Sequence, residues 1–167
     1  MNSVSNTIFI YSNPNTTSYV PYENKTFGFK IMHPSDWEVA ENNPTAESAV
    51  RLIVMFMSPT EFSFNIVSED LSVPLSQDFY VQVSIKHLKE AFPDISILDS
   101  LRTNIGSIPA QTITYTAKVR ETDIKAAVTI FVYKDKAYAL TYGAPPDKFD
   151  SYLGIAQIMA STFRIDN

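Results

Sequence analysis

Three apolar strand patterns follow one another in the second half of the chain, and the links between them are short. The patterns cover residues 110–117, 124–133 and 137–142, and the charged links cover residues 118–123 and 134–136. Links of this length join antiparallel neighbours, because parallel neighbours need a crossover of about a dozen residues or more. The chain is therefore constrained to an antiparallel sheet built from hairpins.

Three further strand patterns come earlier in the chain. Residues 27–33 alternate between apolar and small or polar side chains, and Pro34 ends the pattern. Residues 50–57 form a near-continuous apolar run, whose length indicates a central strand rather than a helix. Residues 62–67 alternate again, and a turn at residues 58–61 joins them to the apolar run as a hairpin.

The sequence also predicts two helices. Ser76 begins the first, because its hydroxyl can cap free N–H groups of the first turn, and Pro93 ends it. A short apolar piece follows at residues 95–98. The second helix begins after Pro145 and Pro146 and places five apolar side chains on one face: Phe149, Tyr152, Leu153, Ala156 and Met159.

Strands in hairpins with one helix between them and one helix at the end predict an α+β domain, in which helices cover an antiparallel sheet. The length of 167 residues fits one such domain. We expect residues 1–21 to be a flexible polar arm or linker and residues 22–167 to be the folded domain. The arm is uncharged and lacks the basic and apolar regions of an export signal. It fits a tether left after removal of a signal or lipid anchor.

Composition excludes several classes of function. The chain carries 13 Lys and Arg against 18 Asp and Glu, a net charge of −5. Nucleic acid is therefore not an expected partner, because such binding draws on basic side chains. The absence of cysteine excludes disulfides, thiolate nucleophiles and iron–sulfur clusters. The four glycines stand apart and form no phosphate-binding loop.

Histidine and hydroxyl residues give no catalytic site in this sequence. His33, Ser35 and Asp36 lie too close together for a triad, which is assembled from distant parts of a chain, so we interpret them as a turn anchored by Trp37. His87 lies at the border of the apolar stripe of the first helix and is expected to be solvated. Neither histidine has a partner at the spacing of a zinc site. No catalytic residue is predicted.

Two sets of side chains, the paired carboxylates and a row of tyrosines, are candidates for a binding site. Carboxylates are paired at three places, and calcium is the one cofactor that they leave open, although no calcium-binding loop motif is present. Tyr138, Leu140 and Tyr142 share one sheet face, with Tyr133 on the neighbouring strand, and form either core under a helix or, in part, the lining of a cleft or partner interface. The carboxylate pairs are Glu69 with Asp70, Glu121 with Asp123, and Asp147 with Asp150.

The order of several segments resembles the PsbP-like domain family. Residues 22–37, YENKTFGFKIMHPSDW, resemble the opening of that domain, with a tyrosine lead, a Gly-Phe strand and a Pro followed by Trp. Later landmarks agree in order: residues 93–98, 106–110, 136–142 and 161–165. The resemblance covers residues 22–165 and implies an α/β/α sandwich around a central antiparallel sheet, shared with a Ran-binding nuclear import family.

The resemblance also implies a function. Members of the family are mostly non-enzymatic accessory proteins, of which those in photosynthetic organisms act at photosystem II and others are exported or lipid-anchored. This chain lacks the basic N-terminal segment of the plant protein, so we treat it as a generic member. We expect a non-enzymatic binding or assembly module outside the cytoplasm, recognising a protein or a small ligand, and touching a membrane only through a removed anchor. The alternatives are an intracellular protein-interaction factor and a carboxylate-based enzyme.

Overall fold

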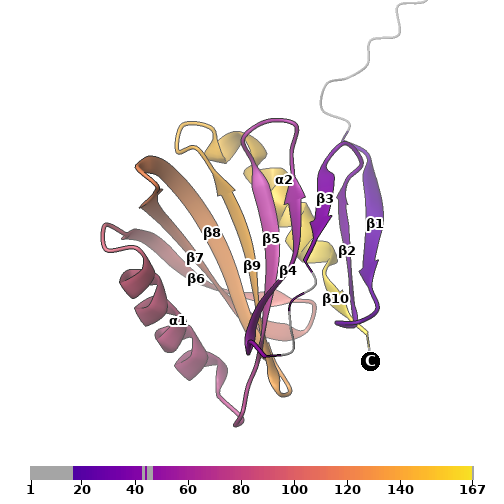
Figure 1. Cartoon of the computed structure of the whole chain (residues 1–167), viewed down its shortest axis with the longest axis vertical. Coiled ribbons are helices and arrows are strands. Elements are labelled where there is room, and N and C mark those ends of the chain that lie inside the picture. The colour runs from indigo at the N-terminus through magenta and orange to yellow at the C-terminus, as the bar shows by residue number, and fades with distance from the viewer. Residues whose placement is uncertain (1–16, 43, 45–46, 167) are drawn as a thin grey trace, which may run out of the picture.

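The structure is a computed structural model that describes residues 17–42, 44 and 47–166. Its main element is a seven-stranded antiparallel sheet in the order β3-β4-β5-β9-β8-β7-β6 (Figure 1). Strands that follow one another along the chain pair with each other in this sheet, except that α1 separates β5 from β6. β5 pairs with β9 instead. The strands are β3 (Glu38–Glu41), β4 (Val50–Met57), β5 (Ser63–Asp70), β6 (Ser96–Ile105), β7 (Ile108–Val119), β8 (Thr122–Tyr133) and β9 (Lys136–Ala144).

A smaller sheet and two helices complete the domain. The smaller sheet has the order β1-β2-β10, with β1 (Tyr19–Asn24), β2 (Phe29–Pro34) and β10 (Arg164–Ile165). The helices are α1 (Gln77–Ala91) and α2 (Phe149–Thr162). No helix in the described part of the chain is long and apolar enough to cross a membrane.

The helices lie on opposite faces of the large sheet. Alternate side chains of β8, such as Val128 and Ile130, pack against α1 in one apolar cluster that includes Val81. The larger cluster contains Phe131 from the other face of β8, together with Met159 of α2 and side chains of the small sheet. This arrangement confirms the predicted sandwich, with the small sheet added beside α2 (Figure 1).

The tyrosine row belongs to the core, and two of its members, Leu140 and Tyr142, also line a hollow on the α2 face. Tyr138, Leu140 and Tyr142 are at most 3% exposed and lie on the α2 face. The Tyr142 hydroxyl donates a hydrogen bond of 3.0 Å to the carbonyl oxygen of Phe149 at the start of α2. Burial raises the pKa of Tyr138 to about 12. These phenols therefore stay neutral and pack as large apolar side chains.

Four strands differ from the prediction. β1, β3 and the two-residue β10 have no counterpart in the sequence analysis, and β6 extends to Ile105, well beyond the predicted apolar piece at residues 95–98. β1, β3 and β6 carry exposed polar side chains that hide the strand periodicity. β1 begins at Tyr19, so a strand crosses the expected domain boundary at residue 22. The remainder of the expected arm, residues 1–16, lies outside the described residues.

The small sheet is fastened to the large one through a tyrosine. The Tyr22 hydroxyl of β1 donates a 2.7 Å hydrogen bond to Glu41 Oε1 of β3. The Tyr22 ring also lies edge-on to Phe56 of β4, with 5.4 Å between the ring centroids. Partial burial and the neighbouring Glu41 carboxylate raise the pKa of Tyr22 to about 12.

Three charged side chains tie together neighbouring strands at one end of the large sheet. Asp70 of β5 lies 2.8 Å from Arg51 of β4 and 2.6 Å from Lys136 of β9. The hydrogen bond from Lys136, with help from the charge of Arg51, lowers the pKa of the Asp70 carboxyl. A lowered pKa means that the ionised carboxylate stabilises the folded chain.

We expect Asp70→Asn to lower the free energy of unfolding at pH 7 by up to about 1 kcal/mol, because the Asp70 side chain is 40% exposed and solvent screens its ion pairs. The wild-type advantage is complete above the carboxyl pKa of the unfolded chain, about 4, and disappears as the pH falls through and below it. Urea unfolding of the wild type and the variant at pH 7 and at pH 3 measures the loss in free energy of unfolding at each pH. Glu90→Gln, which removes only an exposed helix pair with Lys86, serves as the control. An equal loss at both pH values would contradict the prediction.

The side chain of a glutamine at the start of α1 forms hydrogen bonds with the backbone of β8. Gln77 Nε2 donates to the carbonyl oxygen of Ile130, and the N–H of Val132 donates to Gln77 Oε1, both at 2.9 Å. The β7–β8 pairing ends at Ile130, so the Gln77 amide satisfies the N–H of Val132, which β7 does not reach, and adds a hydrogen bond to the Ile130 carbonyl oxygen. This side chain therefore fixes the N-terminal end of α1 on the sheet.

We expect Gln77→Ala to lower the free energy of unfolding by about 1–3 kcal/mol, because it leaves the N–H of Val132 without its partner and removes the hydrogen bond to the Ile130 carbonyl oxygen. Asp78→Ala is the matched control on the same helical turn, and its exposed contact with Arg102 is worth less than about 1 kcal/mol. Chemical unfolding monitored by circular dichroism gives both values. Equal midpoints for Gln77→Ala and the wild type would contradict an anchoring role.

Candidate functional site

The residues proposed from sequence as a turn do not assemble a catalytic site. His33 is 6% exposed, donates from Nδ1 to the carbonyl oxygen of Pro34 at 2.9 Å, and lies 4.9 Å from the ring of Phe56. Ser35 and Asp36 are exposed on the turn that follows. Buried Trp37 ends this turn and donates its N–H to Pro34. The turn interpretation is confirmed, and the three polar side chains do not converge.

The other sequence candidates also lie apart. His87 is exposed on α1, as predicted. Among the paired carboxylates, Glu69 accepts a 2.5 Å hydrogen bond from the Tyr80 hydroxyl, and Asp150 lies 3.9 Å from Lys125. Within the described ranges, no three His, Asp or Glu side chains come close enough to hold a metal ion together. Calcium binding remains a prediction.

The feature that the sequence did not reveal is the open edge of β6. β6 ends the large sheet and pairs only with β7 among the described strands. It has ten residues, and every side chain from Leu98 to Asn104 is exposed. The opposite edge strand, β3, has four residues, two of which are glutamates that protect a short edge. β6 is thus the long accessible edge of the molecule.

The hairpin turn between β6 and β7 determines which backbone groups of β6 face outward. Ile105 pairs with Ile108 across a two-residue turn, in which Gly106 has a φ of 59°. The two residues next to such a turn exchange both backbone hydrogen bonds. In every second residue from there, the backbone N–H and C=O groups point away from the partner strand. The backbone groups of Ser100, Arg102 and Asn104 therefore face outward. Consistent with this, the Ser100 N–H donates to its neighbouring Asp99 carboxylate at 2.8 Å.

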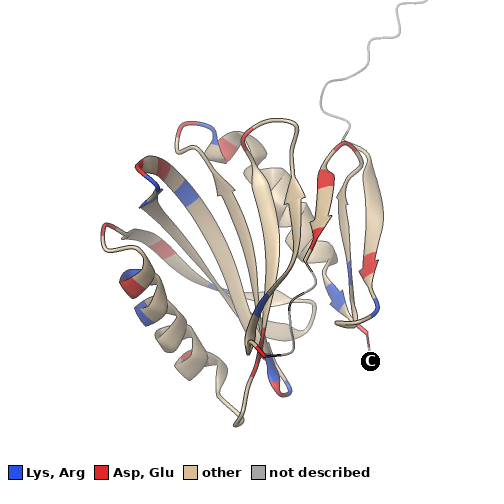
Figure 2. Cartoon of the chain, viewed as in Figure 1, with Lys and Arg blue, Asp and Glu red and all other residues tan. Residues whose placement is uncertain are grey.

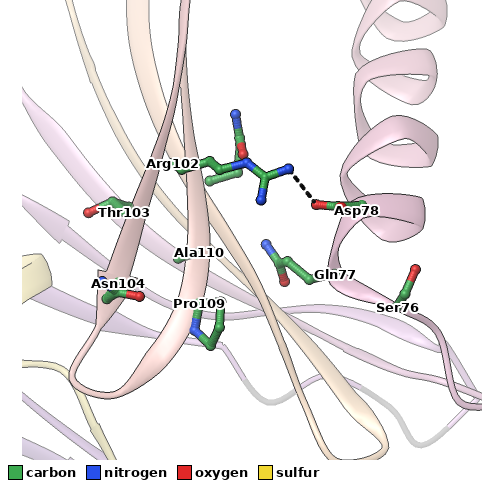
Figure 3. A pocket seen from close by; sticks show the side chains of 9 residues that line it. Ser76, Gln77, Asp78, Arg102, Thr103, Asn104, Pro109 and Ala110 are labelled. Carbon is green, nitrogen blue, oxygen red and sulfur yellow. Dashed lines mark hydrogen bonds and ion pairs between the residues drawn. The ribbon is translucent and has the colours of Figure 1, made fainter.

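A polar hollow of about 530 Å³ lies between β6 and the N-terminal end of α1. Figure 3 shows Arg102 extending from β6 toward α1, where one guanidinium nitrogen lies 3.4 Å from Asp78 Oδ1. Gln77 and Gln111 add amide groups to the lining, and Gln111 donates to the Ser100 hydroxyl at 2.8 Å. The Arg102 side chain is 81% exposed, so most of its N–H donors face solvent.

A second hollow, of about 480 Å³, lies on the opposite face of β6, between the sheet and α2. Leu101 and Ile105 of β6 line it, with Leu153 of α2 opposite. Threonines of β7 and β8 form part of its floor, and the hydroxyls of Thr112 and Thr129 hydrogen-bond to each other at 2.8 Å. The hollow is therefore lined mainly by apolar side chains, and two of the hydroxyl groups in its floor are already partnered.

The chemistry of the two hollows fits binding. Of the titratable groups that line the second hollow, Tyr142 has a pKa raised by burial, which takes it further from neutral pH. A general acid or base needs a pKa near the working pH. Figure 2 shows that charged residues gather at the turns and on α1, while the strands that face α2 are mostly uncharged. The β6 edge with its two flanking hollows is named the β6 surface below.

Comparisons with known proteins identify the family. The model of the family described as "PsbP-like protein" matches residues 10–152. No curated protein sequence matches the chain. The solution structure of cyanobacterial PsbP (CyanoP) from Synechocystis sp. PCC 6803 is similar, with a TM-score of 0.67 and 12% identity, and the match covers 92% of this chain and 95% of that one.

Two other solved structures share the fold. LpqN, involved in cell envelope biogenesis of Mycobacterium tuberculosis, has a TM-score of 0.67 and 13% identity, with 92% of this chain and 93% of LpqN covered. The Saccharomyces cerevisiae Ran-binding protein Mog1p has a TM-score of 0.57 and 11% identity, with 90% and 96% covered. This agrees with the fold expected from the sequence. Because the family model covers most of its length, the chain belongs to the PsbP-like protein family.

Proposed function

We propose that the protein is a non-catalytic module that binds a partner protein through the β6 surface. One observation carries the proposal: a ten-residue edge strand is exposed on both faces and flanked by a hollow on each. An edge of this length attracts other chains unless it is protected. Apolar clusters cover both faces of the central strands of the large sheet, whereas β6 is exposed on both, so the β6 surface is the one best suited to a partner.

Three observations support binding rather than catalysis. His33, Ser35 and Asp36, the histidine, serine and aspartate that lie together in the sequence, form a turn in which His33 is buried and the other two are exposed. Burial raises the pKa of the Tyr142 hydroxyl in the second hollow, away from the range that suits a general acid or base. In addition, Mog1p, which shares the fold, is a Ran-binding protein. The shared fold offers a precedent for protein binding. The kind of partner that this chain binds is inferred from the residues of its own β6 surface.

We also propose that the protein acts outside the cytoplasm. Support comes from LpqN, a protein of the same fold that is involved in cell envelope biogenesis. An intracellular interaction factor is the alternative, since Mog1p shares the fold too. Protease treatment of intact and lysed source cells separates the two: we expect digestion in intact cells once any outer barrier is permeabilised, and protection there would favour the alternative.

We expect a photo-crosslinking amino acid at position 101 to capture a specific protein in source cells, because the Leu101 side chain is 58% exposed at the centre of the β6 surface. The same amino acid at position 50 is the control, since Val50 is 53% exposed on a distant strand. The captured protein is then purified. Its affinity for Leu101→Glu should fall at least about tenfold, whereas its affinity for Val50→Glu should not change. Capture at both positions alike, or equal affinities, would refute the proposal.

A further inference from the structure

We propose that the partner contributes an extended segment that adds to β6 as an additional strand, with apolar residues on one face and acidic or other polar residues on the other. This inference rests on the proposed function and specifies its binding mode. In such strand addition, backbone hydrogen bonds supply affinity, and pockets for alternate side chains supply specificity. The β6 surface carries both elements.

The backbone of β6 is open over a defined window. Ser100, Arg102 and Asn104 face outward, and the Ser100 N–H is already held by Asp99. The register of β6 with β7 also shifts between Ile97 and Asp99, which disturbs the strand at that end. The window available to an added strand therefore runs over residues 101–105, with Arg102 and Asn104 supplying its N–H and C=O groups.

The two hollows lie where the side chains of an added strand would point. Successive side chains of a strand point to opposite faces of its sheet, so those of an added strand would point alternately toward α1 and toward α2. The hollow on the α1 face measures about 530 Å³ and the hollow on the α2 face about 480 Å³. Each is large enough for at least one bulky side chain, and each borders the same stretch of β6.

The linings of the hollows define the chemistry of the segment. On the α2 face, Leu101, Ile105 and Leu153 offer apolar contacts, and the hydroxyls of Thr112 and Thr129 are paired with each other. This face favours apolar side chains. On the α1 face, the single 3.4 Å contact with Asp78 uses one of the five N–H donors of Arg102. A carboxylate from the partner can accept the others, which favours an acidic residue there.

A second copy of this chain fits the β6 surface less well. Its own β6 would bring Leu101 to the α2 face, but on the α1 face Ser100 and Asn104, beside Arg102, are too small to fill the hollow. Antiparallel self-pairing centred on Arg102 would also place two guanidinium groups directly opposite each other, which is destabilising. The size of the hollows and the charge of Arg102 therefore favour a segment from a different protein.

A library of random 12-residue peptides displayed on phage tests this inference, with selection on the folded wild-type protein. We expect the enriched peptides to alternate apolar with acidic or polar residues. Synthesised with a fluorescent label, they should bind the wild type in anisotropy titrations, and Asn104→Ala measures the effect of losing the side chain alone. They should bind Asn104→Pro at least about tenfold more weakly, because proline removes an outward N–H while leaving the β6–β7 pairing intact. Arg102→Ala should weaken the acidic peptides selectively.

Three results would overturn the inference: failure to enrich any peptide, equal binding to Asn104→Pro and the wild type, or enrichment of peptides without alternation. Circular dichroism and thermal melting of Asn104→Pro confirm that its fold is retained, and Asn104→Ser repeats the side-chain control. A crosslinked partner that loses affinity for Leu101→Glu but not for Asn104→Pro would retain the proposed function and refute strand addition. A self-association that Asn104→Pro abolishes would identify a second copy as the occupant instead.

Discussion

β8 lies between β9 and β7 in the large sheet, with α1 packed on one face and the core cluster that includes α2 on the other, so the strand is largely apolar on both faces. Val128 and Ile130 pack toward α1, while Phe131 packs toward α2, and each is at most 5% exposed. The two hairpins that flank β8 hold this strand in register on both sides. Both apolar clusters meet at this strand, and their burial supplies the main stabilisation of the fold.

The same arrangement leaves β6 without a cover. α1 packs on β7 and β8 and is fixed there by Gln77, whereas α2 packs on β9 and on β2 of the small sheet. Neither helix extends over β6, which lies at the far end of the sheet (Figure 1). The hollows therefore arise from the placement of the helices, and the β6 surface follows from the way in which the core is covered.

The apolar elements of this fold could be predicted from sequence, and the polar ones could not. Strands buried on one or both faces, such as β8 and β9, show their periodicity directly, and Ser76 marks the start of α1. β6 shows only its first apolar residues and the turn at Gly106, because an exposed strand has no face to bury and so no alternation. The hollows depend on residues such as Asp78 and Leu153, which only the tertiary fold brings near β6.

An open edge of this length normally favours aggregation, so the features that limit it are informative. At its N-terminal end, the register shift after Ile97 and the Asp99 carboxylate on the Ser100 N–H disrupt pairing with another strand. Similar protection at the other edge takes the form of a short strand with two glutamates. Residues 101–105 carry one charge, that of Arg102, and no such disruption. The N-terminal end of β6 is thus protected against unspecific pairing, while residues 101–105 stay open. This is the pattern expected of an edge that pairs with one specific partner.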